Sequence, residues 1–177
     1  MRICVISFYD ESWHRLTDLT IPHLQAYCSK WGYTLYCGQP FASPDTREPY
    51  SRFLCTHQLL RDNFDAVMWL NPDAIITNHL IRIEDRLGDE QFVVGGDRQG
   101  ISANVFIARN TLAVLELTSA IYEGGELLTG PHPFPETASL NRYLRFARYQ
   151  HCPTILPVRM MNASMPDPTD PKDSPGW

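Results

Sequence analysis

Asn71, Pro72 and Asp73 directly follow the apolar run Ala66–Leu70, so polar oxygen atoms stand at the end of a buried segment. Side chains two residues apart in an extended segment share one face, and Asn71 and Asp73 can therefore meet one bound group. Amide and carboxylate oxygens bind hard divalent cations, which neutralise the charge that develops on a phosphate leaving group. We interpret this triplet as a candidate metal and catalytic site, although the isolated tripeptide is also typical of a turn.

The hydrophobic pattern predicts the elements that position this triplet. Short β-branched runs indicate strands, and apolar residues at helical spacing indicate helices. The triplet is predicted to interrupt a strand, because the extended pattern resumes at 74–77. The expected strands are 2–8, 33–37, 66–70, 91–94 and 104–108, and the expected helices are 17–31, 51–62, 112–122 and 136–147.

Alternation of strands and helices predicts an α/β architecture with a mostly parallel central sheet. Ligands in such sheets bind beyond the carboxyl ends of the strands, where the triplet falls. The 177 residues, 44% of them hydrophobic, suit one domain, which we place at 1–162. Residues 163–177 form a Pro- and Asp-rich C-terminal tail, and the proline-containing stretch 38–50 is predicted to be a surface loop.

Composition excludes several functional classes. Fifteen basic residues against 20 acidic ones give a net charge of −5 without a basic cluster, so nucleic acid is not an expected partner. No apolar run is long enough to span a membrane and no signal peptide is recognisable, from which we expect a cytoplasmic protein. The five cysteines form no CxxC pair and are expected to be reduced core residues. The histidine spacing indicates no zinc site.

The run from Phe64 to Asn78, with its apolar strand, its Asn71-Pro72-Asp73 triplet and the following Ala74-Ile75-Ile76, resembles the GT-A glycosyltransferases. The likeness is to the group of galactosyl-, mannosyl- and xylosyltransferases, whose Asp-x-Asp motif stands at this point. Asn71 replaces the first Asp, which keeps an oxygen but removes one negative charge. The resemblance extends to about Asn162 and implies a Rossmann-like nucleotide-diphospho-sugar transferase domain that uses Mn²⁺ or Mg²⁺.

Further residues are assigned through this resemblance. Arg52, in Tyr50-Ser51-Arg52, stands where the family places a basic residue that faces the nucleotide, although it also fits a solvated arginine at a helix start. Ser102 and Ala103 fall at the donor-sugar position, in a segment similar to the family's Asn-Ala/Ser-Gly before a Val-Phe strand. Asn104 replaces the usual glycine there. A plain polar connection is the alternative for this segment.

The resemblance also assigns Glu136, in Phe134-Pro135-Glu136, to the acidic position that faces the reacting sugar. The helix dipole alone also favours an acidic residue in a first turn. Phe8, Tyr9 and Asp10 fall where the family holds the base and ribose, and Tyr9 could stack on uracil or simply pack. The family's terminal histidine, which completes the metal shell, has no counterpart beyond Asn162.

These observations predict a glycosyltransferase that moves a sugar from a nucleotide-sugar donor, UDP-linked, to a saccharide or glycan acceptor. The resemblance implies metal assistance, retention of anomeric configuration, and Asp73 and Glu136 as the catalytic residues. The alternative is a catalytically impaired GT-A-like module that binds nucleotide sugars or glycans. A dinucleotide or methyl-donor enzyme is disfavoured, because the segment after the first strand contains no glycine.

Overall fold

The computed structural model describes residues 1–38, 48–97, 100–129 and 132–161. Most of the loop predicted at 38–50 and the whole tail predicted at 163–177 lie outside the described residues. Within the described part of the chain, no helix has the length and apolar character needed to cross a membrane.

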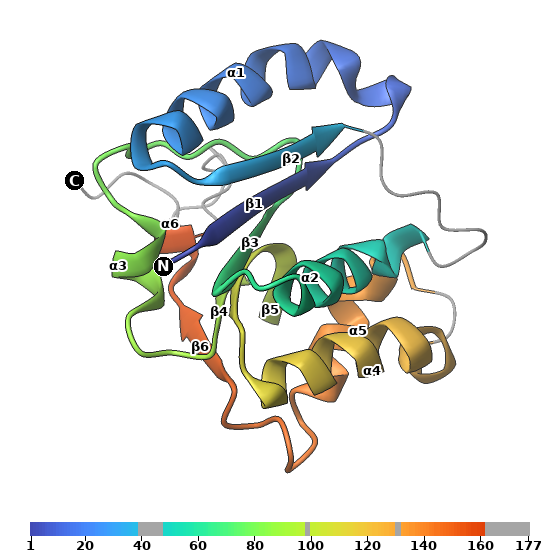
Figure 1. Ribbon diagram of the computed structural model, residues 1–177. Coiled ribbons are helices and arrows are strands. Elements are labelled where there is room, and N and C mark those ends of the chain that lie inside the picture. The colour runs from blue at the N-terminus through green and yellow to red at the C-terminus, as the bar shows by residue number, and fades with distance from the viewer. Residues whose placement is uncertain (39–47, 98–99, 130–131, 162–177) are drawn as a thin grey trace, which may run out of the picture.

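A six-stranded sheet forms the centre of the domain, with strand order β2-β1-β3-β5-β4-β6 (Figure 1). Parallel pairing joins β1 to β2, β1 to β3 and β4 to β6, whereas β5 is antiparallel to both of its neighbours. Five strands therefore share one direction, which confirms the predicted α/β fold with a mostly parallel sheet. The strands are β1 (Ile3–Phe8), β2 (Thr34–Gly38), β3 (Ala66–Leu70), β4 (Phe92–Asp97), β5 (Gly100–Arg109) and β6 (Pro153–Leu156).

Two apolar cores lie on opposite faces of the sheet, because alternate side chains of each strand point to opposite sides. On β3, Val67 and Trp69 join one core, whereas Ala66, Met68 and Leu70 join the other. The Val67 side is covered by α2 (Ser51–Arg61), α4 (Leu112–Thr129) and α5 (Pro135–Tyr143). The other side is covered by α1 (His14–Trp31) and α3 (Ile83–Leu87) (Figure 1). The remaining helices are η1 (Glu11–Trp13), η2 (Glu48–Tyr50) and α6 (Val158–Met161).

The segment 74–77 corrects one expectation, because it is not a strand. The backbone N–H of Ala74 donates to the carbonyl of Asn71 at 3.0 Å, which closes a turn and takes the chain out of the sheet. Pro72 has no N–H to contribute to a ladder. Ala74 and Ile76 pack at the margin of the core beside α1 instead, so their apolar character reflects packing rather than strand pairing.

Several boundaries also differ from the sequence pattern. β5 begins at Gly100, α4 continues to Thr129, and α5 ends at Tyr143 rather than at residue 147. The pattern missed β6, a four-residue edge strand whose side chains are only partly buried or exposed. Four of the five cysteines are buried free thiols, as expected, whereas Cys37 on β2 is exposed.

Candidate active site

A cleft of about 250 Å³ lies at the carboxyl ends of β1 and β3, beside the start of α2. This is the position where open α/β sheets bind ligands. Five residues that the sequence assigned to nucleotide binding line it, namely Phe8, Tyr9, Asp10, Arg52 and Asn71, together with Trp13, Pro49, Ser51, Trp69 and Pro72. The fold therefore brings together residues from three separate parts of the chain.

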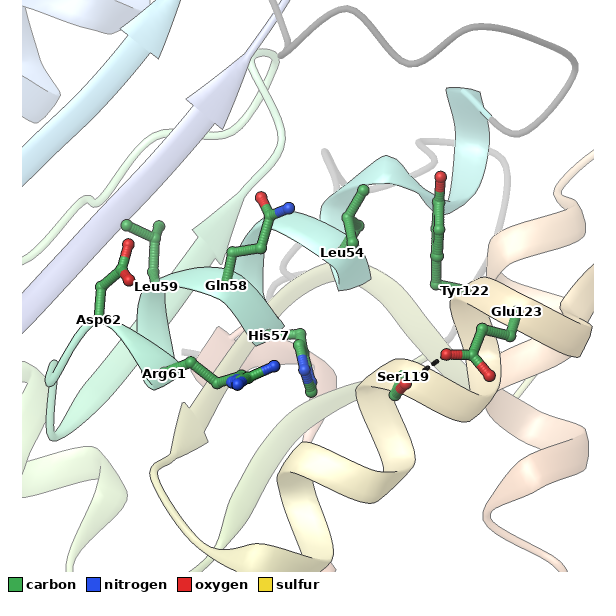
Figure 2. A pocket seen from close by; sticks show the side chains of 9 residues that line it. All are labelled: Leu54, His57, Gln58, Leu59, Arg61, Asp62, Ser119, Tyr122 and Glu123. Carbon is green, nitrogen blue, oxygen red and sulfur yellow. Dashed lines mark hydrogen bonds between the residues drawn. The ribbon is translucent and has the colours of Figure 1, made fainter.

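A larger depression, of about 700 Å³, lies between α2 and α4 (Figure 2). Three of its polar side chains are engaged within their own or neighbouring helices. Nδ1 of His57 lies 3.0 Å from the carbonyl oxygen of Leu115, and the Ser119 hydroxyl donates to Glu123 at 2.8 Å. We place the candidate site in the smaller cleft, because there a cationic side chain and aromatic rings meet at the strand ends.

Asn71 lies at the centre of a polar network at the end of β3. Its Oδ1 accepts hydrogen bonds from Nε1 of Trp69 at 2.9 Å and from Nη1 of Arg52 at 3.3 Å. Its Nδ2 donates to Oδ1 of Asn104 at 3.2 Å, and its backbone N–H donates to the Asn104 carbonyl at 2.9 Å. The antiparallel register pairs Leu70 with Val105, so Asn71 and Asn104 meet as the next residues of the ladder.

Arg52 reaches from the first turn of α2 into this network and is mostly buried, with 14% of its side chain exposed. Its Nη1 also donates to the carbonyl of Ala103 at 3.0 Å, and its guanidinium carbon lies 5.1 Å from the centre of the Trp69 ring. Burial lowers the pKa of Arg52, while the nearby carboxylates of Glu136 and Asp73 oppose this change. The alternative of a solvated arginine at a helix start is wrong.

Glu136 lies in the first turn of α5, and its Oε1 is 3.7 Å from Nη2 of Arg52. The residue is buried, with 6% exposed. The ion pair is too long for a hydrogen bond, and of its two members only Arg52 lines the cleft. Eighty-four residues separate the two positions in the sequence, and only the packing of α2 and α5 on one face of the sheet joins them.

Two further polar side chains of α5, Thr137 and Asn141, hold the beginning of β5 in place. The Ala103 N–H donates to the Thr137 hydroxyl at 3.2 Å. Oδ1 of Asn141 accepts from the Ile101 N–H at 3.2 Å, and its Nδ2 donates to the Ile101 carbonyl at 2.6 Å. Sequence reasoning missed this positioning contact.

Ser102 and Ala103 are both buried, with 2% and 0% exposed. The Ser102 hydroxyl accepts from the backbone of Asn104 at 3.3 Å, and Ala103 packs in the core on the α2 side. Neither lines the cleft surface, whereas the Ala103 carbonyl holds Arg52. Their assignment to the donor-sugar position stays a prediction.

Aromatic side chains form the wall of the cleft beside β1. The rings of Phe8 and Trp69 meet edge to face, with their centres 6.0 Å apart. Tyr9 is half-buried and Trp13 is 37% exposed, and both line the cleft. Sequence reasoning missed Trp13, which its place between the first strand and the first helix could have suggested.

Asp10 caps η1. Its Oδ1 accepts from the backbone N–H of Ser12 at 2.7 Å and from the Ser12 hydroxyl. These two hydrogen bonds lower the pKa of Asp10. The other carboxylate oxygen faces no partner that the described residues provide, so an ionised oxygen is present at the cleft margin.

Asn71 does not fit the predicted metal site, whereas the assignment of Asp73 as a metal ligand stays a prediction. An amide oxygen has two lone pairs, and both are directed at donors in the Asn71 network, one of which is cationic. Asp73 is exposed. The described residues contain no group of three or more Asp, Glu, His or Cys side chains that could surround an ion.

No family model and no curated protein sequence matches this chain. Solved structures do match in fold. The chain is similar to a glycosyltransferase involved in the glycosylation of the major capsid of PBCV-1, at a TM-score of 0.71 and 15% identity over 92% of this chain and 85% of that one. It is also similar to the glycosyltransferase GlyE of Streptococcus pneumoniae TIGR4, at a TM-score of 0.61 and 16% identity over 90% of this chain and 46% of that one.

A third match is the galactosyltransferase LgtC, solved in complex with donor and acceptor sugar analogs, at a TM-score of 0.54 and 12% identity over 88% of this chain and 74% of that one. At identities this low, the structural matches show a shared fold and nothing more specific. The domain has the GT-A fold of nucleotide-diphospho-sugar transferases, with the candidate cleft at the carboxyl ends of its parallel strands.

Proposed function

We propose that this chain transfers a sugar from a nucleotide-sugar donor, UDP-linked, to a saccharide or glycan acceptor. The observation that carries the proposal is the position of the Arg52 guanidinium, in the wall of the strand-end cleft and 3.7 Å from the Glu136 carboxylate. A cation for a diphosphate and a carboxylate for the reacting sugar then lie side by side. The GT-A fold supports the same class of reaction.

Each part of the cleft has a role in this proposal. Tyr9 and Trp13 offer aromatic surface to the base, and Asp10 offers an ionised oxygen to a ribose hydroxyl. We assign Arg52 to the diphosphate, because a guanidinium can donate two parallel hydrogen bonds to phosphate oxygens. Ser102 and Ala103 remain predicted residues at the donor-sugar position, and Asp73 remains a predicted catalytic residue.

During transfer, the bond between the anomeric carbon and the diphosphate oxygen breaks, and the diphosphate leaves with the electron pair. The Arg52 charge stabilises this leaving group as its negative charge develops. The acceptor hydroxyl oxygen forms the new bond to the anomeric carbon and gives its proton to the departing diphosphate oxygen. We assign to Glu136 the stabilisation of positive charge on the reacting sugar. Retention of configuration is proposed from the family resemblance.

Thermal denaturation with a panel of nucleoside diphosphates and their sugar conjugates tests the proposal, because a ligand that binds only the folded state raises Tm. We expect UDP and a UDP-sugar to stabilise the chain, and release of UDP on addition of a saccharide acceptor. Anomeric proton NMR of the product would test retention. A panel in which no nucleotide raises Tm would contradict the proposal.

The alternative of a non-catalytic binding module is favoured by one observation, the Asn71–Asn104 pair at the two positions where the family has Asp and Gly. Nucleotide binding alone does not distinguish the two functions. Stabilisation by a UDP-sugar without UDP release, for every acceptor supplied, would support the binding module.

A further inference from the structure

We infer that the guanidinium of Arg52, rather than a divalent cation, is the positive charge that receives the donor diphosphate, so that nucleotide binding does not depend on Mn²⁺ or Mg²⁺. This inference rests on the proposed function. It assigns to Asn71 the task of holding Arg52 in place without neutralising it.

The side-chain oxygen of Asn71 already accepts two hydrogen bonds. A metal ion bound there would have to displace the indole N–H of Trp69 and the Nη1 of Arg52. Trp69 is 4% exposed, so its N–H would lose its partner without gaining water. The ion would also lie beside the Arg52 guanidinium, which would repel it as a like charge.

Arg52 keeps N–H donors that can bind a diphosphate. Of its five N–H groups, the two on Nη1 point to the neutral oxygens of Asn71 and Ala103. The three on Nε and Nη2 make no hydrogen bond within the described ranges, and Glu136 is beyond hydrogen-bond length from Nη2 at 3.7 Å. Since Arg52 lines the cleft, these three donors can meet anionic oxygens there.

The side chain at position 71 also affects the charge around Arg52. A carboxylate in place of the amide would lie 3.3 Å from Nη1 and form an ion pair with Arg52. The pair would cancel the charge that a diphosphate needs. The neutral amide instead accepts the same hydrogen bond and adds no further negative charge to that of Glu136, which lies 3.7 Å from Nη2. Asn71 is therefore suited to a resident arginine cation and unsuited to a metal.

Calorimetric titration of the full chain with UDP, in EDTA and then in excess Mn²⁺, tests the inference. We expect the two affinities to agree within about threefold. Binding that requires Mn²⁺ would overturn the inference and leave the proposed function intact. Absence of UDP binding in both buffers would contradict the proposed function, and the inference with it.

Asn71→Asp gives a second test, with Asn78→Asp as its matched control. Asn78 is exposed, and its Oδ1 accepts from the Leu80 N–H at 2.9 Å, which an aspartate can also do. In EDTA, we expect Asn71→Asp to weaken UDP binding by roughly tenfold or more and Asn78→Asp to leave it unchanged. Unchanged or tighter UDP binding by Asn71→Asp in EDTA would overturn the inference. Circular dichroism of both variants checks that they are folded.

Discussion

Oε1 of Glu136 lies 3.7 Å from Nη2 of Arg52, a separation that leaves an ion pair in place but no hydrogen bond. The two side chains come from α5 and α2, which pack on the same face of the sheet. A diphosphate on Arg52 would therefore place its attached sugar next to the Glu136 carboxylate.

Glu136→Gln should slow sugar transfer by about 10²–10⁴-fold, because glutamine has the shape of glutamate without its negative charge. Affinity for UDP should be equal or higher, since Arg52 loses a neighbouring negative charge. Release of UDP from a UDP-sugar and calorimetry with UDP measure the two quantities. Glu116→Gln, which affects an exposed ion pair with Arg148, is the control. Parallel loss of binding and transfer would argue against separate roles.

Tyr9→Ala should weaken UDP binding by about 1–2 kcal/mol through loss of an aromatic surface for the base, and Tyr9→Phe should retain most of the affinity. Tyr36→Ala serves as the control, because Tyr36 is 44% exposed on β2 and does not line the cleft. Calorimetry with UDP measures the change. Equal affinities for Tyr9→Ala and the parent would mean that Tyr9 only packs.

Asn141→Ala should lower the free energy of unfolding by about 2–3 kcal/mol, since the N–H and the carbonyl of Ile101 both lose their partner. Urea denaturation followed by circular dichroism measures this loss. Transfer should fall as well, because Asn141 holds the strand that carries Ala103 and Asn104. A variant with parental stability would show that water replaces both hydrogen bonds.

Gly124→Ala should destabilise the chain by about 1–3 kcal/mol, because a Cβ at this position of α4 would lie 2.5 Å from the Tyr143 hydroxyl oxygen. In a Tyr143→Phe background the nearest ring carbon is 3.8 Å away, an ordinary contact. There the same substitution should be neutral or stabilising, since alanine favours helix by about 1 kcal/mol. An equal cost in both backgrounds would exclude this steric explanation.

The chain should lose stability at alkaline pH through its buried thiols. Burial raises the pKa of Cys4 and Cys28 to about 12, from an ordinary value of 9.0. The unfolded chain releases these protons first, so the stabilisation is complete below pH 9 and declines as the pH rises toward 12. Urea midpoints between pH 8 and 10 measure the slope, and Cys4→Ala should reduce it. A slope that Cys4→Ala leaves unchanged would assign the effect to other groups.

The sequence pattern was sufficient where neighbouring residues decide the structure. The all-apolar run Ala66–Leu70 forms a buried strand, and Gly32, at a φ of 72°, ends α1 where a stop was expected. It failed at 74–77, where apolar residues pack without strand pairing, and at β6, whose short run has no buried face. In both cases the outcome depends on whether a neighbouring strand is present, which local pattern does not encode.

The sequence by itself determined the α/β class and the position of Asn71 and Asp73 at a strand end, because hydrophobic periodicity and chain order carry that information. Only the tertiary structure decided what Asn71 contacts. Its partners Trp69, Arg52 and Asn104 come from β3, α2 and β5, and their meeting depends on the antiparallel insertion of β5 beside β3. A hydrogen bond requires two groups to be close in space, whatever their separation along the chain. The sequence therefore indicated Asn71 as a metal ligand, whereas the fold directs donors of Arg52 and Trp69 at its oxygen.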